Sequence, residues 1–228
     1  ELHYDIGDGF VSQEMEENFG DNYQTSIVGL YDGMIIEYYI LAVSLEGVIQ
    51  TFPSNAPQNT ILFILGELPD LYSTNFESNS NDWIVGDLGD EASSGIWELA
   101  EPVATYNDDG NLVQPGEDNS DDGTFCFITG NGGGDGGFDD VDGGHTTLYS
   151  PEFNFNGLNE VVLTYWRWYT NNVGDNGNND KWIVSVSTDD GNSWIDLENT
   201  SSSDASWTRQ RYILSDHIDF GSNVKFRF

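Results

Sequence analysis

Glycines and carboxylates are concentrated in one stretch of the sequence, residues 130–144. It carries Asp135, Asp139, Asp140 and Asp142 among a run of glycines. Carboxylate oxygens are the hard ligands that calcium prefers, and glycine permits the sharp turns that bring backbone carbonyls to an ion. Without a cation these side chains would repel one another. We therefore predict that Asp139, Asp140 and Asp142 bind calcium; a mobile glycine-rich linker is the alternative.

Three further acidic groups lie in polar segments. They are Asp87, Asp90 and Glu91; Asp118, Asp121 and Asp122; and Asp175 and Asp180. In a β-sandwich, loops at one end can meet, so two of these groups could share an ion with residues 130–144. We assign Asp87 and Asp90 as metal ligands. A solvated loop is the alternative for each group.

Aromatic residues alternate with a cation in the run Tyr165-Trp166-Arg167-Trp168-Tyr169. We interpret one face of this run as core, with a cation–π contact on Arg167. The alternative is a sugar-stacking platform. We therefore name Trp166 and Trp168, with Asp175 and Asp180, as a candidate surface for a glycan or protein partner.

Catalytic motifs are weak. The GxGxxG spacing at Gly132, Gly134 and Gly137 lacks a following helix, and the surrounding carboxylates would repel a pyrophosphate. The histidines are scattered, and there is no HExxH motif. We predict that the chain has no catalytic site of its own.

Residues 187–194 match the Asp-box pattern S-x-D-x-G-x-[ST]-W. In this motif the aspartate of a tight hairpin accepts hydrogen bonds from backbone N–H groups, and the tryptophan packs below. The role is structural, so the motif predicts a hairpin and does not indicate hydrolysis.

Composition limits the class of protein. The chain has 40 Asp and Glu against 6 Lys and Arg, a net charge of −34. Such a chain repels nucleic acid and anionic membrane surfaces and attracts cations. A solvated acidic surface suited to a salty environment is the alternative to metal binding.

The one cysteine, Cys126, lies in an apolar run and is expected to be a buried thiol. No apolar span of membrane length occurs, so we expect no membrane insertion.

Short apolar runs separated by Gly, Asn, Asp and Ser clusters predict an all-β chain. We expect a partial immunoglobulin-like sandwich over residues 1–68, a linker around Pro69, and a second sandwich over residues 72–228. In the second segment, strands are expected near residues 96–99, 124–129, 146–149, 161–169, 182–187, 211–214 and 224–228. Both ends of the chain have strand-like sequence, so we expect it to belong to a longer protein.

Several motifs together resemble a known family. They include Asn75-Phe-Glu77-Ser, Trp83-x-x-Gly86-Asp87, Gly95-Ile-Trp97-Glu98, Cys126-Phe-Ile-Thr-Gly-Asn131 and Asp140-Val-Asp142-Gly-Gly-His-Thr-Thr-Leu-Tyr-Ser-Pro151. Over residues 72–228 the chain is similar to the MAM-like jelly-roll modules of secreted Bacteroidetes and Planctomycetes proteins. The first segment is similar to the small immunoglobulin- or fibronectin-III-like module that often precedes them.

The resemblance implies a jelly roll, secretion to the extracellular space or cell surface, and bound calcium with Glu77, Asp140 and Asp142 as ligands. Such modules often follow a peptidase domain. The family usually closes with a further strand carrying an acidic motif, and the sequence stops before one.

Three functions remain open at this point. The first is a calcium-binding accessory or adhesion region that binds an extracellular glycan or protein beside neighbouring domains of a longer chain. The second is the non-catalytic C-terminal part of a secreted peptidase of zinc carboxypeptidase type. The third is a self-assembling subunit of an extracellular filament or surface layer.

Overall fold

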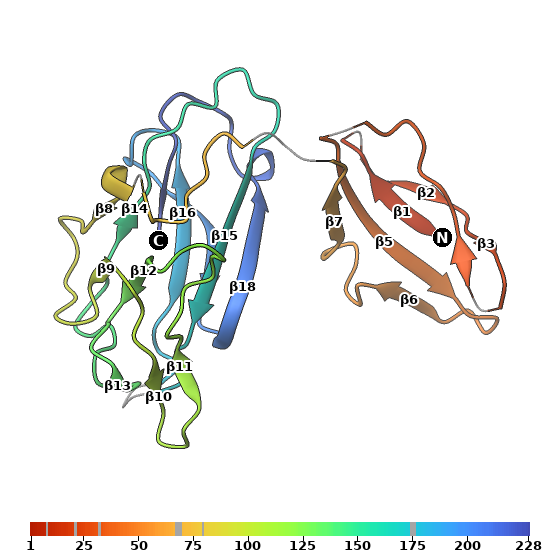
Figure 1. The fold of residues 1–228 in the computed structure, drawn as a ribbon. Coiled ribbons are helices and arrows are strands. Elements are labelled where there is room, and N and C mark those ends of the chain that lie inside the picture. Colours follow the sequence, from red (N-terminus) through yellow and green to blue (C-terminus); the bar gives the residue numbers. More distant parts are fainter. Residues whose placement is uncertain (8, 21, 32, 67–69, 79, 174–176) are drawn as a thin grey trace. The chain divides into compact units, whose positions relative to one another are not determined.

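The computed structural model describes residues 1–228 except residues 8, 21, 32, 67–69, 79 and 174–176. The backbone divides into two compact units, Glu1–Ser73 and Thr74–Phe228. The predicted linker position Pro69 lies outside the described residues. Both units are built from strands, which confirms the all-β class (Figure 1). No helix in the described part of the chain is long and apolar enough to cross a membrane.

The first unit contains one antiparallel sheet in the order β2-β1-β5-β6, with β7 also paired to β5, and a separate β3–β4 ladder. The strands are β1 (Leu2–Asp5), β2 (Val11–Gln13), β3 (Glu16–Glu17), β4 (Tyr23–Gln24), β5 (Ile35–Val43), β6 (Ile49–Phe52) and β7 (Ile61–Ile64). The central strand, β5, is rich in β-branched and aromatic residues, which favour a pleated and half-buried surface. Its Ile36 is completely buried.

The second unit contains twelve of the strands and two short 3-10 helices. The strands are β8 (Ile84–Val85), β9 (Trp97–Ala100), β10 (Thr105–Tyr106), β11 (Leu112–Gln114), β12 (Cys126–Thr129), β13 (Gly134–Asp135), β14 (Leu148–Tyr149), β15 (Val162–Tyr169), β16 (Trp182–Ser187), β17 (Ile195–Thr200), β18 (Asp204–Ile213) and β19 (Lys225–Arg227), and the 3-10 helices are η1 (Ser80–Asp82) and η2 (Leu214–Asp216).

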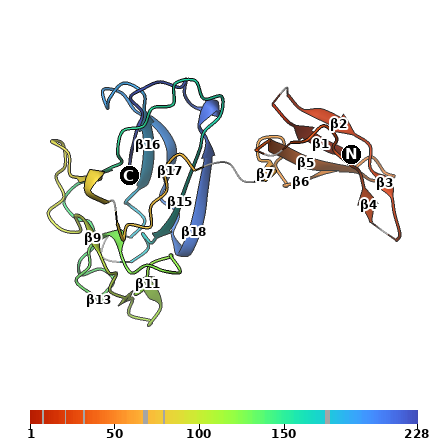
Figure 2. The same cartoon turned by 45° about the horizontal axis from the view of Figure 1, so that its top comes forward.

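Two layers of strands enclose the core of this unit. One layer is a five-stranded sheet in the order β17-β16-β19-β14-β8. The β15–β18 ladder forms part of the other layer (Figure 2). The core joins Val186 and Phe226 of the five-stranded sheet to Leu163 and Tyr212 of the ladder. This packing of one strand layer on another is a β-sandwich.

A second pair of strands, β9 and β12, also packs on the five-stranded sheet through aromatic rings. Trp97 of β9 meets Trp182 of β16 with ring centroids 6.0 Å apart. Trp83 contacts both Phe127 of β12 and Phe228, at 5.9 Å in each case. Aromatic side chains bury a large area each, so these contacts extend the core between the layers.

Most predicted strands of the second unit are present with shifted ends, and residues 182–187 match β16 in full. The prediction for residues 211–214 was too short, because β18 already begins at Asp204. Strand β17 was not predicted at all. Its sequence, IDLENT, is polar, and the strand exists through its pairing with β16.

Candidate functional site

The Asp-box forms the predicted hairpin between β16 and β17. Asp189 Oδ1 accepts a hydrogen bond from the Ser193 backbone N–H at 2.8 Å, and its Oδ2 accepts one from the Ser193 hydroxyl at 2.7 Å. The pKa of Asp189 lies below its ordinary value. The largest cause is the hydrogen bond from the Ser193 hydroxyl, and the next is the bond from the Ser193 backbone N–H. This carboxylate therefore fixes a turn.

Within residues 130–144, Asp139 turns back onto its own loop. Its Oδ2 accepts a hydrogen bond from the Gly132 backbone N–H at 2.5 Å. The Asp139 carbonyl lies so close to Gly130 that a Cβ there would overlap it. Glycine at position 130, with φ of +72°, is thus required by both conformation and space. The loop is closed by its own peptide groups around the Asp139 carboxylate.

Asp140 and Asp142 attach the same loop to residues 93–95 through their backbone. The Asp140 carbonyl accepts a hydrogen bond from Ser94 Oγ at 2.9 Å, and the Asp142 carbonyl accepts one from the Ser93 N–H at 2.7 Å. Burial raises the pKa of the Asp140 carboxyl, and the nearby charges of Asp142, Asp180 and Asp139 raise it further. The structure therefore brings the charge of Asp180 to the predicted loop, and the crowding of acids is unfavourable for the ionised form.

Asp87 and Asp90 lie on a neighbouring loop, where Asp90 joins two chain segments. Its Oδ2 accepts hydrogen bonds from the backbone N–H groups of Asp87 at 3.0 Å and Thr147 at 2.8 Å. Its Oδ1 accepts one from the Thr147 hydroxyl at 2.7 Å and lies 3.5 Å from His145 Nε2. Burial, followed by the hydrogen bond and charge of Asp87, raises the pKa of Tyr149 to about 12. Asp90 thus anchors the loop to the chain just before β14.

Glu77 lies apart from these loops and reaches the segment that precedes β12. Its Oε1 accepts hydrogen bonds from the backbone N–H groups of Phe125 at 2.6 Å and Thr124 at 2.7 Å. These two bonds lower the pKa of Glu77, and the bond from Phe125 has the larger effect. The Glu77 carboxylate therefore stays ionised.

Three side-chain oxygens converge next to Gly123. A Cβ built on Gly123 would lie 2.9 Å from both Glu77 Oε1 and Asp118 Oδ2, and closer still to Ser120 Oγ. The Ser120 hydroxyl also donates a hydrogen bond to Asp118. Position 123 is therefore suited to glycine, because these oxygens already occupy the space that a side chain would need. From the sequence, Asp118 is predicted only as one member of an acidic loop group, and nothing in the sequence pairs it with Glu77.

Cys126 lies close to this group of oxygens. Burial, followed by the charges of Asp118 and Glu77, raises the pKa of its thiol to about 12. The thiol is therefore protonated at neutral pH and is a poor metal ligand. Burial of this cysteine is partial in the structure.

The donor atoms near one another limit where a metal ion could bind. Among the residues that the structure describes, no three His, Cys, Asp or Glu side chains gather closely enough to hold an ion. The loop acids at 139, 140 and 142 therefore do not form such a cluster by themselves. The oxygens beside Gly123 are two carboxylates and a hydroxyl, a hard donor set of the kind that calcium takes.

A buried polar network that the sequence did not reveal lies between the layers. Glu198 of β17 accepts hydrogen bonds from Arg167 Nη2 at 2.7 Å, Tyr165 OH at 2.5 Å and Trp182 Nε1 at 3.0 Å. The Arg167 guanidinium also lies 5.8 Å from the Tyr169 ring and 5.9 Å from the Trp182 ring, which confirms the cation–π contact. No spacing in the sequence signals that position 198 would meet position 167.

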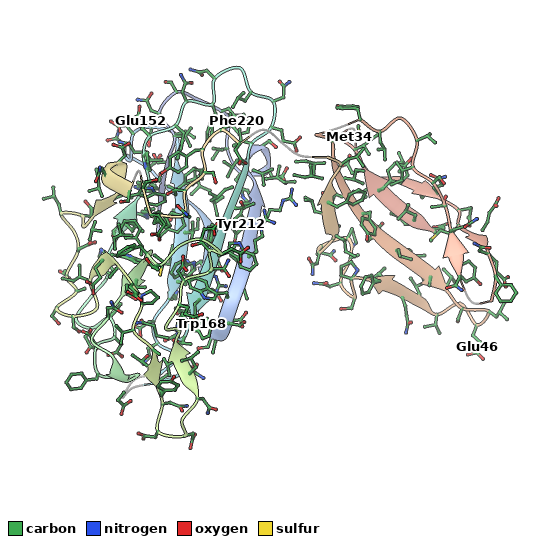
Figure 3. All side chains as sticks on the ribbon, in the orientation of Figure 1. Met34, Glu46, Glu152, Trp168, Tyr212 and Phe220 are labelled. Atoms are coloured by element: carbon green, nitrogen blue, oxygen red, sulfur yellow. The ribbon has the colours of Figure 1, made fainter. Side chains whose placement is uncertain are left out.

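The predicted partner surface is present only in part among the described residues. Trp166 is half exposed, whereas Trp168 donates its indole N–H to the Val113 carbonyl of β11 at 2.6 Å. Asp180 is exposed, and Asp175 lies outside the described residues. Figure 3 marks Trp168 on the β15–β18 ladder.

Comparisons of the chain with protein-family models, curated proteins and solved structures gave no match.

Proposed function

We propose that the chain is a calcium-binding β-sandwich region of accessory or adhesion type, which acts outside the cell and binds a glycan or a protein. The observation that carries the proposal is the convergence of Glu77, Asp118 and Ser120 oxygens beside Gly123. The MAM-like resemblance independently implies calcium with Glu77 as a ligand.

The orientation of Glu77 supports this site. Two backbone N–H groups hold Oε1, so the carboxylate is ionised and fixed before any ion arrives. Asp118 is half-buried beside it, and two carboxylates around one space repel each other. A bound divalent cation would offset that repulsion, with backbone carbonyls and water completing the 6–8 oxygens that calcium takes.

The use of carboxylates elsewhere supports a non-catalytic role. Asp90, Asp139 and Asp189 each accept a hydrogen bond from a backbone N–H group. These acids close turns and join loops, which is a structural task. Calcium sites of extracellular modules work at up to millimolar calcium, so a site with only two carboxylates is compatible with a secreted protein.

The test is thermal unfolding of the full chain in calcium and in EDTA. We expect calcium to raise Tm by several degrees, which corresponds to about 1–3 kcal/mol of ligand linkage. Glu77→Gln and Asp118→Asn should abolish the calcium-dependent shift. Asp109→Asn, which makes the same charge change at an exposed turn, is the matched control and should keep it.

Two results would contradict the proposal. One is a melting curve that is identical in calcium and EDTA. The other is a calcium shift that survives in Glu77→Gln and Asp118→Asn but is lost in Asp140→Asn, which would move the ion to residues 130–144.

A further inference from the structure

The outward side of the β15–β18 ladder is defined by the pairing of its strands. Tyr165 and Arg167 point inward, because Tyr165 meets Phe228 and Arg167 meets Glu198 in the core. Side chains alternate along a strand, so Trp166 points outward. Its partner across the ladder is Arg209. Thr164 faces outward in the same way, opposite Arg211.

Two more tryptophans extend this side of the ladder. The rings of Trp168 and Trp207 meet edge to face, with centroids 6.2 Å apart. The bond from Trp168 to the Val113 carbonyl fixes one end of the pair. We call Trp166, Trp168, Trp207, Arg209 and Arg211 the outer strip.

The two arginines of the outer strip form no ion pair with any described residue. Neither Arg209 nor Arg211 forms an ion pair or donates a hydrogen bond there, although the chain has 40 acids. Burial lowers the pKa of Arg211, and the like charge of Arg209 lowers it further, whereas Glu160 acts in the opposite sense from beyond ion-pair distance. Two like charges side by side, neither in an ion pair, favour the binding of an anion.

Trp166 of the outer strip also lacks a polar partner among the described residues. Trp166 is 50% exposed, and its indole N–H donates to no described residue. Tryptophan and arginine are the side chains most enriched at the centres of binding surfaces. Trp166 and Arg209 are directly opposite across the ladder, which places their Cβ atoms about 4.5–5.5 Å apart.

The shape of the outer strip selects the kind of ligand. Arg211 lies opposite Thr164, so the outer strip extends along β15 from position 164 to Trp168. At about 3.4 Å per residue and about 4.8 Å between strands, it is roughly 14 Å long and 10 Å wide. This area is less than a fifth of the roughly 800 Å² that a stable protein partner covers on one side. A flat strip of this size fits a few units of a chain-like ligand better than a globular partner.

We propose that the outer strip binds an acidic polysaccharide, with uronic acid rings stacked on Trp166 and their carboxylates paired with Arg209 and Arg211. The planar guanidinium matches a carboxylate in bidentate geometry. The proposal deepens the glycan binding of the proposed function and does not depend on the calcium site. At 0.15 M salt, acids farther than about 8 Å from the strip are largely screened, so the net charge of −34 does not prevent binding.

The experiment titrates the full chain with hexagalacturonate in 0.15 M NaCl, by calorimetry and by tryptophan fluorescence. Arg209→Gln and Trp166→Ala should each weaken binding about 10- to 100-fold, the range for one charge-assisted contact or one stacked ring. Lys181→Gln removes the same charge at another exposed position and should bind as the parent does. The methyl ester of the hexasaccharide, which lacks the carboxylates, should lose at least 10-fold.

Several outcomes would overturn the proposal. These are equal binding of acid and ester, equal losses in Lys181→Gln and Arg209→Gln, a preference for a sulfated hexasaccharide, or an absence of binding. Self-association of the chain that Arg209→Gln abolishes would assign the strip to a second copy instead. Calcium binding is measured by Tm in separate samples. A failure to bind hexagalacturonate would therefore not contradict the calcium site at Glu77, and the absence of a calcium-dependent Tm shift would not contradict binding of an acidic polysaccharide.

Discussion

The buried Arg167–Glu198 pair gives the sharpest stability prediction. Both side chains are only 10% exposed, and Glu198 accepts three hydrogen bonds. Glu198→Leu would leave the guanidinium in the core without a carboxylate. Removing one partner of a buried pair costs about 3–5 kcal/mol. For a unit of this size, about 1 kcal/mol corresponds to about 2–4 °C, so Tm should fall by about 6–20 °C.

The pair itself is not expected to be strongly stabilising. Among the described residues, Arg167 Nε and Nη1 are buried without hydrogen-bond partners. Burying charged groups with incomplete pairing is costly, so a well-packed apolar replacement can equal or exceed the native pair. The double variant Arg167→Met/Glu198→Leu should therefore recover most of the loss. Tyr165→Phe, which removes one hydrogen bond and keeps the ring, should cost about 1 kcal/mol.

The assay is urea and thermal unfolding followed by tryptophan fluorescence. All 7 tryptophans lie within Thr74–Phe228, so the signal reports the second unit alone. A loss below about 1 kcal/mol in Glu198→Leu, or a double variant as unstable as that single variant, would refute the reasoning. The first result would mean that the guanidinium reaches water, and the second that packing dominates over charge.

Two further predictions concern residues 130–144. Burial raises the pKa of Asp140, so its ionised form costs stability at neutral pH, and this cost disappears as the pH falls below the ordinary value of 3.8. Asp140→Asn should therefore raise Tm at pH 7 in EDTA and leave it unchanged at pH 3; a lower Tm at pH 7 in EDTA would contradict this. Gly130→Ala adds a Cβ that overlaps the Asp139 carbonyl, whereas Gly134, also at positive φ, has open space. Gly134→Ala should cost about 1–2 kcal/mol from conformation alone, and Gly130→Ala at least twice as much, as measured by urea unfolding. Equal losses would show that the loop opens to accommodate the methyl group.

Patterns confined to a few neighbouring residues were predicted well. The β-branched and aromatic residues of Ile35–Val43 and the alternation within Val162–Tyr169 indicated strands that are present. The Asp-box predicted its hairpin, because the bonds from Asp189 reach only four residues ahead. Strand β17 escaped prediction, since its sequence has low β propensity and its conformation is imposed by β16.

The sequence by itself determined the all-β class, the acidic charge and the hairpin of the Asp-box, because these follow from composition and from local backbone preferences. Only the tertiary structure decided which carboxylates meet which partners. Glu77 finds Thr124 across 47 residues, Asp90 finds Thr147 across 57, and Glu198 finds Arg167 across 31. With 40 acids of similar chemistry, local pattern does not distinguish the one that closes a loop from the one that faces water. That choice is made by the folded layers, which bring distant backbone N–H groups and cations within hydrogen-bond reach of particular side chains.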